Sequence, residues 1–323
     1  MRYLEIDTAK KISKIGLGTW QFGSREWGYG QPYADREANA IVRRALELGI
    51  TLFDTAEAYG FGRSERILGR ALGADKDMAF LATKIFPILP VAPVVEQRAI
   101  ASANRMGAHR LDLYQVHQPN PVVRDRTTMR GMRALQTVGL VDEVGVSNYS
   151  LQRWRSAEQA LGGRVLSNQV RYNLADRGPE RELLPFAREY GRIVIAYSPL
   201  AQGLLSGRYG PGNRPANRVR AANPLFMPEN LDRAGELIAT LNEVAMAHSA
   251  TAAQAALAWV IHHPAVAAIP GASTVAQVES NAAAADIDLT SDEYEALSAA
   301  AVRFRPVTGP AALSRMARVR LRR

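Results

Sequence analysis

Cysteine is absent from this chain of 323 residues. Without thiols, the chain can form no disulfide bond, offers no thiolate metal ligand and has no thiol nucleophile. Long apolar runs are also missing. The N-terminus, MRYLEIDTAKK, lacks the apolar region of a signal peptide, and no segment approaches the length of a membrane span. We therefore expect a soluble cytoplasmic protein without membrane partners.

Acidic residues are outnumbered, since 40 Lys and Arg face 31 Asp and Glu and the formal net charge is +9. Much of the excess lies near the C-terminus, where no acid follows Glu295. We treat residues 301–323 as a basic tail. The body of the chain has no interleaved aromatic and basic residues and no known nucleic-acid motif, so we expect no nucleic-acid partner.

Lysine is scarce, with only five among the 40 basic residues. One of them, Lys84, ends the apolar run FLATK at 80–84. Because arginine supplies almost every other cation, a lysine in this place indicates that a compact ammonium is needed there. Another apolar run, within ITLFDTAEAYG at 50–60, closes on Asp54. A buried acid needs a partner, and Lys84 is the cation that ends a matching run.

Apolar runs alternate with helical stripes along the chain. The pattern predicts strands at 50–54, 79–83, 111–116, 141–146, 165–170, 193–197, 266–269 and 285–289, nearly all separated by helices. Two short runs, 3–6 and 12–17, predict an N-terminal β-hairpin. Eight strand–helix units over this length favour a single (β/α)8 TIM barrel covering residues 1–323, with long loops at its C-terminal face, such as 201–229.

A helix-opening GxGxxG motif is also missing, so the sequence supports a Rossmann phosphate loop poorly. In its place, three glycines lie within IGLGTWQFGS at 15–24. Trp20, Trp27 and Tyr29 follow in a glycine-rich loop. They either line an apolar ligand pocket, which we favour, or cover the end of the barrel.

Polar side chains end three consecutive predicted strands: Asp54, Lys84 and His117. Tyr59 lies five residues beyond the first of them. In a barrel the carboxyl ends of the strands meet at one mouth, so we expect these four side chains to lie together. An ammonium lowers the pKa of a nearby tyrosine, and a histidine can orient a carbonyl oxygen. Polarising a carbonyl and protonating the alkoxide is what a reductase needs, while a cofactor supplies the hydride.

The chain resembles the aldo-keto reductase family. FDTAEAYG, LATK, DLYQVH, GVSNYS, NQVRYNL, AYSPL and IPGAST match the family's strand-end motifs in order. The resemblance implies a catalytic tetrad of Asp54, Tyr59, Lys84 and His117, in which Tyr59 is the general acid in reduction. It also implies a substrate pocket that includes Trp20, Trp27, Tyr29, Tyr59, Phe86 and His117.

The resemblance further implies a nicotinamide cofactor. Ser147, Asn148 and Gln169 would bind the carboxamide, and Tyr197 would stack on the ring. Ser198, Leu200, Gln202 and Gly203 would bind the pyrophosphate, and the adenosine end would contact Gly271, Ser273, Thr274, Gln277 and Asn281. Further contacts would come from Gly18, Thr19, Trp20 and Asp54. No cluster of metal ligands is apparent, so we expect no metal.

Several of these residues have simpler interpretations. Ser147 or Asn148 can cap the following helix, and Tyr197 can belong to the core. Asn168 can be a plain hydrogen-bonding residue at the end of a strand, and Glu57 can form a surface pair with Arg63 or Arg66.

The adenosine end departs from the family pattern. Many members have a basic residue where this chain has Gly271 to Ser273, and a Glu where it has Ser280. A 2′-phosphate is best held by cations, so this departure weakens the preference for NADP(H) over NAD(H). Arg208, Arg214 or Arg218 from the long loop can supply the charge. We expect NADP(H), with NAD(H) as the alternative.

Three function classes remain open. The first is an NAD(P)H-dependent carbonyl reductase acting on a small aldehyde or ketone. The second is a cofactor-binding, redox-sensing regulatory protein of the same fold. The third is a hydrolase or lyase with a barrel fold, which needs no nicotinamide cofactor. The complete tetrad favours the reductase, because a protein that only binds cofactor does not need all four side chains.

Overall fold

A single parallel sheet organises the molecule. The computed structural model describes residues 1–24, 32–216, 218–309 and 312. Each strand is hydrogen-bonded to the next along the chain. The strands are β1 (Leu17–Gly18), β2 (Leu52–Asp54), β3 (Phe80–Ile85), β4 (Leu111–Val116), β5 (Val141–Ser147), β6 (Val165–Arg171), β7 (Ile193–Tyr197) and β8 (Val266–Ala268).

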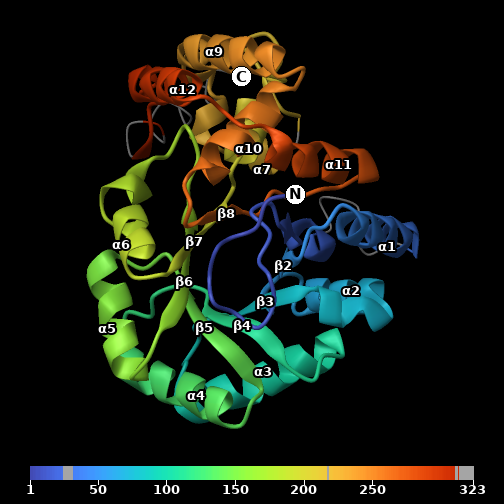
Figure 1. Cartoon of the computed structure of the whole chain (residues 1–323), viewed down its shortest axis with the longest axis vertical. Coiled ribbons are helices and arrows are strands. Elements are labelled where there is room, and N and C mark those ends of the chain that lie inside the picture. Colours follow the sequence, from blue (N-terminus) through green and yellow to red (C-terminus); the bar gives the residue numbers. More distant parts are fainter. Residues whose placement is uncertain (25–31, 217, 310–311, 313–323) are drawn as a thin grey trace, which may run out of the picture.

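The sheet closes on itself between its last strand and the segment that leads into β1. The amide of Gly16 donates to the carbonyl of Ala268 at 2.8 Å, and the amide of Ala268 donates to that of Lys14 at 2.8 Å. Helices surround the curled sheet (Figure 1). The predicted (β/α)8 barrel is therefore confirmed.

The helices bury apolar stripes against the outside of the sheet, with Val95, Ala99 and Ala103 of α3 as an example. The longer ones are α1 (Pro32–Glu47), α2 (Arg63–Leu72), α3 (Ala92–Met106), α4 (Asp125–Thr137), α5 (Leu151–Leu161), α6 (Leu183–Glu189), α9 (Gly235–Ala247), α10 (Ala252–His262), α11 (Val275–Ala283) and α12 (Ser291–Arg303). A capping box of Thr290 and Glu293 opens α12. Within the described ranges no single helix is both long and apolar enough to cross a membrane, and α9 with α10 passes that test only as a pair bent by 90°.

One predicted strand is wrong. Residues 285–289 contribute no strand to the sheet. The remaining strand of the barrel is β1, which the sequence pattern did not predict. Ile287 and Leu289 are buried in the outer core, so their alternation with Asp reflects burial on one side without strand pairing. The two residues of β1 are too few to show a period in sequence. Glycine is required there, because a Cβ on Gly18 would lie 2.8 Å from the carbonyl oxygen of Ile269.

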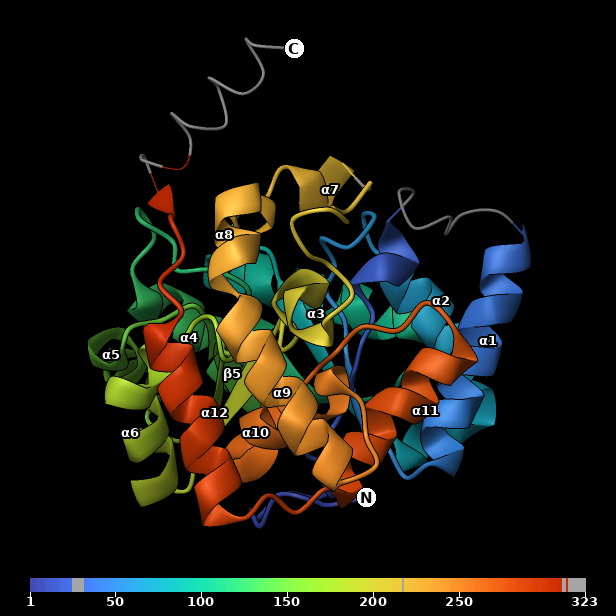
Figure 2. The same cartoon turned by 90° about the horizontal axis from the view of Figure 1, so that it is seen from above.

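The N-terminal segment covers the end of the barrel where the strands begin. Its predicted hairpin pairs around one antiparallel bridge between Tyr3 and Ser13. Lys10 Nζ donates to the carbonyl of Ala79 at 2.7 Å and to Asp112 Oδ2 at 3.0 Å, just before β3 and at the start of β4. The N-terminus and the short helices α7 (Arg218–Ala221) and α8 (Pro228–Arg233) lie at opposite ends of the molecule (Figure 2).

The predicted loop at 201–229 is long but contains short helical turns, namely η5 (Ala201–Ser206), α7, η6 (Pro224–Phe226) and the start of α8. Part of the predicted basic tail, up to Arg303, belongs to α12, and Arg303 Nε pairs with Glu236 Oε1 at 2.6 Å. Most of the remaining tail lies outside the described residues.

Candidate active site

An ion pair of two buried side chains forms the centre of the site. Lys84 Nζ in β3 lies 2.6 Å from Asp54 Oδ1 at the end of β2, and it donates to the carbonyl of Thr55 at 2.7 Å. Burial acts to lower the pKa of Lys84, but the Asp54 carboxylate and the Tyr59 hydroxyl outweigh it, so the pKa of Lys84 is raised. The ammonium therefore stays charged at neutral pH.

Tyr59 and His117 complete the group. Lys84 Nζ lies 3.4 Å from the Tyr59 hydroxyl, and the rings of Tyr59 and His117 meet edge to face with centroids 5.7 Å apart. The four side chains that the sequence singles out are thus brought together at one mouth of the barrel.

The protonation states of Tyr59 and His117 follow from their burial. Burial raises the pKa of Tyr59 and Lys84 opposes this, so the net shift is upward although the ammonium acts as the sequence predicts. Burial, with help from Lys84, lowers the pKa of His117 to about 3. At neutral pH Tyr59 therefore carries its proton and His117 is uncharged.

Two glycines fix the loop that carries Tyr59. Gly60 has a φ of +59°, and a Cβ on it would lie 2.5 Å from the carbonyl oxygen of Gly23. A Cβ on Gly23 would lie 2.5 Å from the carbonyl carbon of Tyr59. These are contacts between backbones, which only glycine permits. The 15–24 segment is therefore packed directly against the Tyr59 loop.

The second oxygen of Asp54 accepts from amides on the far side of the barrel. Gln169 Nε2 in β6 donates to Asp54 Oδ2 at 2.7 Å, and Gln115 Nε2 in β4 lies 3.4 Å from the same oxygen. Gln115 is fully buried, and our sequence analysis did not select it. The available signal is its position two residues before His117, which places both on one face of β4.

Ser147 and Asn148 form a linked cluster with Tyr197. The Tyr197 hydroxyl donates to Asn148 Oδ1 at 3.0 Å, and Asn148 Nδ2 donates to Ser147 Oγ at 3.0 Å. The alternative capping role is wrong, because Ser150 caps α5 by accepting from the amide of Arg153. Asn168 is a hydrogen-bonding residue, since its Nδ2 donates to the carbonyl of Tyr149 at 2.8 Å.

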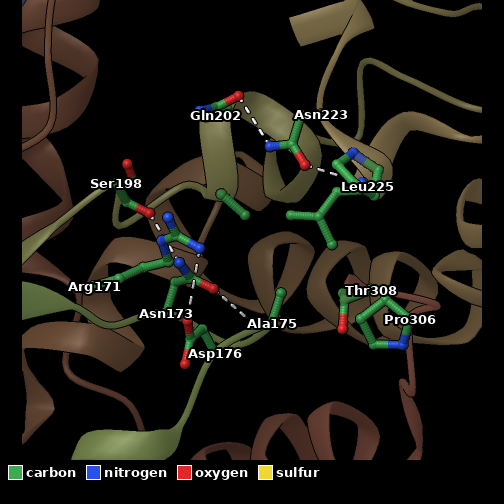
Figure 3. A pocket seen from close by; sticks show the side chains of 12 residues that line it. Arg171, Asn173, Ala175, Asp176, Ser198, Gln202, Asn223, Leu225, Pro306 and Thr308 are labelled. Carbon is green, nitrogen blue, oxygen red and sulfur yellow. Dashed lines mark hydrogen bonds and ion pairs between the residues drawn. The ribbon is translucent and has the colours of Figure 1, made fainter. Parts of the chain in front are cut away.

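The turn after β7 has an unusual backbone. Ser198, Ala201 and Gln202 have positive φ angles without being glycine, and Gly203 has a φ of +99°. Leu200 is half-buried within this turn. The side chain of Gln202 accepts from Asn223 Nδ2 at 3.0 Å. The turn borders a pocket of about 230 Å³ (Figure 3).

The residues predicted for the adenosine end lie together beside residues 18–21. Gly271 forms a parallel bridge with Gly18, and Gln21 Nε2 donates to the carbonyl of Ala272 at 2.9 Å. At the start of α11, Thr274 accepts from the amide of Gln277. Two further predicted contacts also lie here. The amide of Ser273 donates to the side chain of Gln277, and Asn281 Nδ2 lies 3.4 Å from the carbonyl of Gly271. Thr19, another predicted cofactor contact, donates its hydroxyl to the carbonyl of Asp54.

The predicted substrate pocket is described only in part. Phe86 is 39% exposed, and its ring centroid lies 6.0 Å from that of His117. Trp20 is 44% exposed at the start of η1 (Trp20–Gly23). Trp27 and Tyr29 lie outside the described residues.

Glu57 does not pair as the sequence suggests. The alternative partners, Arg63 and Arg66, lie in the first turn of α2, but Glu57 Oε2 accepts from Arg98 Nε of α3 at 2.9 Å. Glu57 also accepts from the backbone amide of Phe86. This pairing, which is distant in sequence, ties the loop after β2 to α3.

No group of three or more His, Cys, Asp or Glu in the described part of the chain is arranged to hold a metal ion. The site offers an ammonium, a protonated phenol, a neutral imidazole and a cluster of amides and hydroxyls. Such a set can bind and protonate a polar organic group without a metal.

Comparisons with known proteins agree with this architecture. An uncharacterised oxidoreductase of Mycobacterium tuberculosis is 55% identical over 323 residues, 100% of both chains. A methylglyoxal reductase of Escherichia coli is 35% identical over 291 residues, which is 90% of this chain and 91% of the relative.

Solved structures are similar over nearly the whole length. A glycerol dehydrogenase from Gluconobacter oxydans matches with a TM-score of 0.86 and 27% identity, covering 95% of this chain and 98% of that one. An aldo-keto reductase from Klebsiella pneumoniae in complex with NADPH matches with a TM-score of 0.75 and 29% identity, covering 95% and 96%. Residues 14–302 match the sequence profile of the Aldo/keto reductase family, and the chain therefore belongs to that family.

Proposed function

We propose that this protein is an NADP(H)-dependent carbonyl reductase that converts an aldehyde or ketone to an alcohol, with Tyr59 as the proton donor. One observation carries the proposal. The Lys84 ammonium touches both Asp54 Oδ1, at 2.6 Å, and the Tyr59 hydroxyl, at 3.4 Å. This contact gives the phenol a charged neighbour that stabilises the phenolate left behind when the proton is transferred.

Each residue of the group has its own role in the proposed reaction. Asp54 holds Lys84 charged and in place. Neutral His117 donates a hydrogen bond to the carbonyl oxygen and orients it, and Tyr59 then protonates that oxygen. In the oxidation of an alcohol, the Tyr59 phenolate takes the proton back.

The cofactor, when bound, supplies the hydride. The cluster of Ser147, Asn148 and Gln169 fits a carboxamide, because a carboxamide has both donors and an acceptor and this cluster offers both kinds of partner. The Tyr197 ring stands beside the cluster and can stack on a flat heterocycle.

The choice of NADP(H) is supported by similar proteins from Klebsiella pneumoniae, whose structures contain NADP or NADPH. The chain lacks the basic residue that many family members have near Gly271, which favours NAD(H). The arginines of the long loop favour NADP(H) instead. Of these, Arg214 already uses its Nε on the carbonyl of Phe226 at 3.0 Å, whereas Arg208 has an exposed side chain.

The test is a reductase assay with NADPH and NADH at equal concentration against aldehydes, ketones and keto-sugars. Methylglyoxal belongs in the panel because a relative is named for it. Absorbance reports turnover, and quenching of protein fluorescence reports cofactor binding. Quenching without turnover on any carbonyl would favour the regulatory reading. A lack of quenching by either nucleotide would favour a hydrolase or lyase, and a clear preference for NADH would overturn the cofactor assignment.

A further inference from the structure

Asn148, which we propose to bind the carboxamide of the cofactor, has an unusual backbone. Its φ is +60°, in the left-handed region that favours glycine and that Asn adopts more readily than most other residues. Its amide donates to the carbonyl of Gln169 at 2.9 Å, and its Nδ2 lies 3.4 Å from the carbonyl of His117. A turn of this kind keeps its shape only when the residues beside it are held. The next residue, Tyr149, therefore influences where the Asn148 side chain points.

Tyr149 is held through both its backbone and its buried side chain. Asn168 Nδ2 in β6 donates to the Tyr149 carbonyl at 2.8 Å, and the Tyr149 hydroxyl donates to Asp125 Oδ1 at 2.8 Å. Burial raises the pKa of Tyr149, and the neighbouring Asp125 carboxylate raises it further, so the hydroxyl keeps its proton at neutral pH and remains a donor. Tyr149 is thus fixed between β6 and the first residue of α4.

Arg153 fixes the carboxylate that receives this hydrogen bond. Its Nε donates to Asp125 Oδ2 at 2.7 Å and its Nη2 donates to Asp125 Oδ1 at 3.0 Å, which is the paired geometry of a guanidinium on a carboxylate. Its guanidinium carbon lies 4.9 Å from the centroid of the Tyr149 ring. The side chains of Arg153 and Asp125 are only 29% and 15% exposed, so the pair is largely sheltered from water. We call Tyr149, Asp125 and Arg153 the anchor.

The guanidinium of the anchor also reaches the loop after β4. Arg153 Nη2 donates to the carbonyl of Asn120 at 2.7 Å, three residues after His117. Asn120 Nδ2 donates in turn to the carbonyl of Pro87, in the loop after β3, at 2.7 Å. The anchor therefore joins the turn that carries Asn148 to the loop that follows His117.

We propose that the anchor positions the nicotinamide, because Tyr149, held by Asp125 and Arg153, orients Asn148 toward the carboxamide. The inference rests on the proposed function, since it takes Asn148 as a carboxamide contact. The three anchor residues are positioning residues that act through Asn148 and not by touching the cofactor. Loosening the anchor should therefore weaken the binding of the nicotinamide end and leave the rest of the nucleotide bound as before.

A second group of the same chemistry lies after β6 and provides a matched control. The hydroxyl of Tyr172 donates to Glu180 Oε1 at 3.1 Å, and Arg177 donates to the same carboxylate through Nε at 2.8 Å and through Nη2 at 2.6 Å. The Tyr172 ring packs against Trp259 of α10, with centroids 5.4 Å apart. Tyr172 does not follow a residue of the carboxamide cluster, so Tyr172→Phe removes an equivalent hydroxyl without loosening Asn148.

The test compares nucleotides with and without the nicotinamide. NADP⁺ is paired with 2′-phospho-ADP-ribose, and NAD⁺ with ADP-ribose, so the result does not depend on which cofactor the protein prefers. Each nucleotide is titrated by calorimetry into the wild type and into three variants. Tyr149→Phe removes the hydroxyl and keeps the ring, Arg153→Lys keeps the charge without the planar fork, and Tyr172→Phe is the control. Thermal unfolding verifies that each variant is folded.

We expect the wild type to bind each dinucleotide more tightly than its partner without nicotinamide. In Tyr149→Phe and Arg153→Lys the dissociation constant of the dinucleotide should rise about threefold to tenfold, the scale of losing one hydrogen bond, and that of its partner should change less than about twofold. Tyr172→Phe should keep the wild-type ratio of the two constants. If the ratio is also unchanged in both anchor variants, the anchor has only a structural role and the inference is wrong.

The wild-type titration separates this inference from the proposed function. If the wild type binds dinucleotide and partner alike, the carboxamide assignment within the proposed function is wrong, and the inference falls with it. If the wild type prefers the dinucleotide and both anchor variants keep the full preference, the cofactor site stands and the anchor inference alone is wrong. A selective loss in the anchor variants supports the inference even if no carbonyl is reduced. Should one anchor variant fail to fold, the other decides the test.

Discussion

The amide of Gln169 donates to Asp54 Oδ2 at 2.7 Å, across a separation of 115 residues in sequence. One oxygen of Asp54 thus pairs with Lys84, and the other accepts from the Gln169 amide, which we also propose to bind the carboxamide of the cofactor. A bound carboxamide would share or take this amide, leaving Gln115 at 3.4 Å as the other donor near Oδ2. The proposed contact of Gln169 with the carboxamide would therefore couple cofactor binding to the environment of the buried ion pair.

Replacing Gln169 with Leu should weaken both properties. Asp54 Oδ2 would lose its shorter hydrogen bond in a buried place, which costs about 1–3 kcal/mol in the free energy of unfolding. The dissociation constant for NADPH should also rise. Urea unfolding and fluorescence titration measure the two effects. The matched control is Gln115→Leu, whose 3.4 Å contact is weak, and an equal loss of cofactor affinity in both variants would contradict the assignment of Gln169.

Tyr59→Phe should remove the proton donor and keep the ring. We expect carbonyl reduction to fall by about a hundredfold or more, which is the scale of losing a general acid, with NADPH binding nearly unchanged. Steady-state turnover and fluorescence quenching provide the two readouts. Wild-type turnover in this variant would exclude Tyr59 from the mechanism.

Lys84→Met should affect stability, rate and pH dependence together. It leaves Asp54 as an unpaired buried charge, which costs about 3–5 kcal/mol in the free energy of unfolding. It also removes the group that lowers the pKa of Tyr59, so the alkaline limb of the reduction profile should move to higher pH. Chemical denaturation and a pH–rate profile test these expectations.

The double variant Asp54→Asn/Lys84→Met is the control for that experiment. Removing both charges should restore much of the stability without restoring activity, since the buried unpaired carboxylate is gone but the ammonium is still missing. If the double variant were as unstable as Lys84→Met, packing rather than charge would explain the loss.

His117 should make stability depend on pH. Its pKa is lowered to about 3 by burial and Lys84, while an unfolded histidine titrates near 6.5. Between these values the unfolded chain binds the additional proton, so the free energy of unfolding falls as pH decreases from about 6.5 toward 3. His117→Gln should flatten this dependence. Urea unfolding at several pH values from 7.5 to 5 measures it, and an unchanged slope in the variant would show that His117 does not contribute.

Gly60→Ala tests the packing behind Tyr59. The new Cβ would lie 2.5 Å from the carbonyl oxygen of Gly23, so the backbone must move. Gly191→Ala is the matched control, because Gly191 has a similar φ of +61° and nothing within 4 Å of the new Cβ. We expect the control to lose only about 1 kcal/mol of stability, the cost of the backbone conformation, with normal turnover. Gly60→Ala should lose more stability and also turnover. Equal effects would show that the contact is not needed to hold the Tyr59 loop.

The sequence pattern predicted seven of the eight barrel strands because each of these lies in a short stretch rich in apolar residues. The prediction failed at β1, because a strand of two residues shows no alternation of apolar and polar side chains. It also failed at 285–289, where the alternation reflected burial without strand pairing. It also suggested Arg63 or Arg66 as partners of Glu57, since these are near in sequence, whereas the partner Arg98 comes from a later helix.

The sequence by itself determined the order of strands and helices and the polar residues that end the strands, because both depend on local periodicity and residue type. Beyond the predicted group of Asp54, Tyr59, Lys84 and His117, only the tertiary structure decided which of these side chains meet. The bond from Gln169 to Asp54 and the closure of β8 on the segment before β1 both depend on how the sheet curls. No local pattern encodes such contacts, since each joins segments that become neighbours only when the strands align in register.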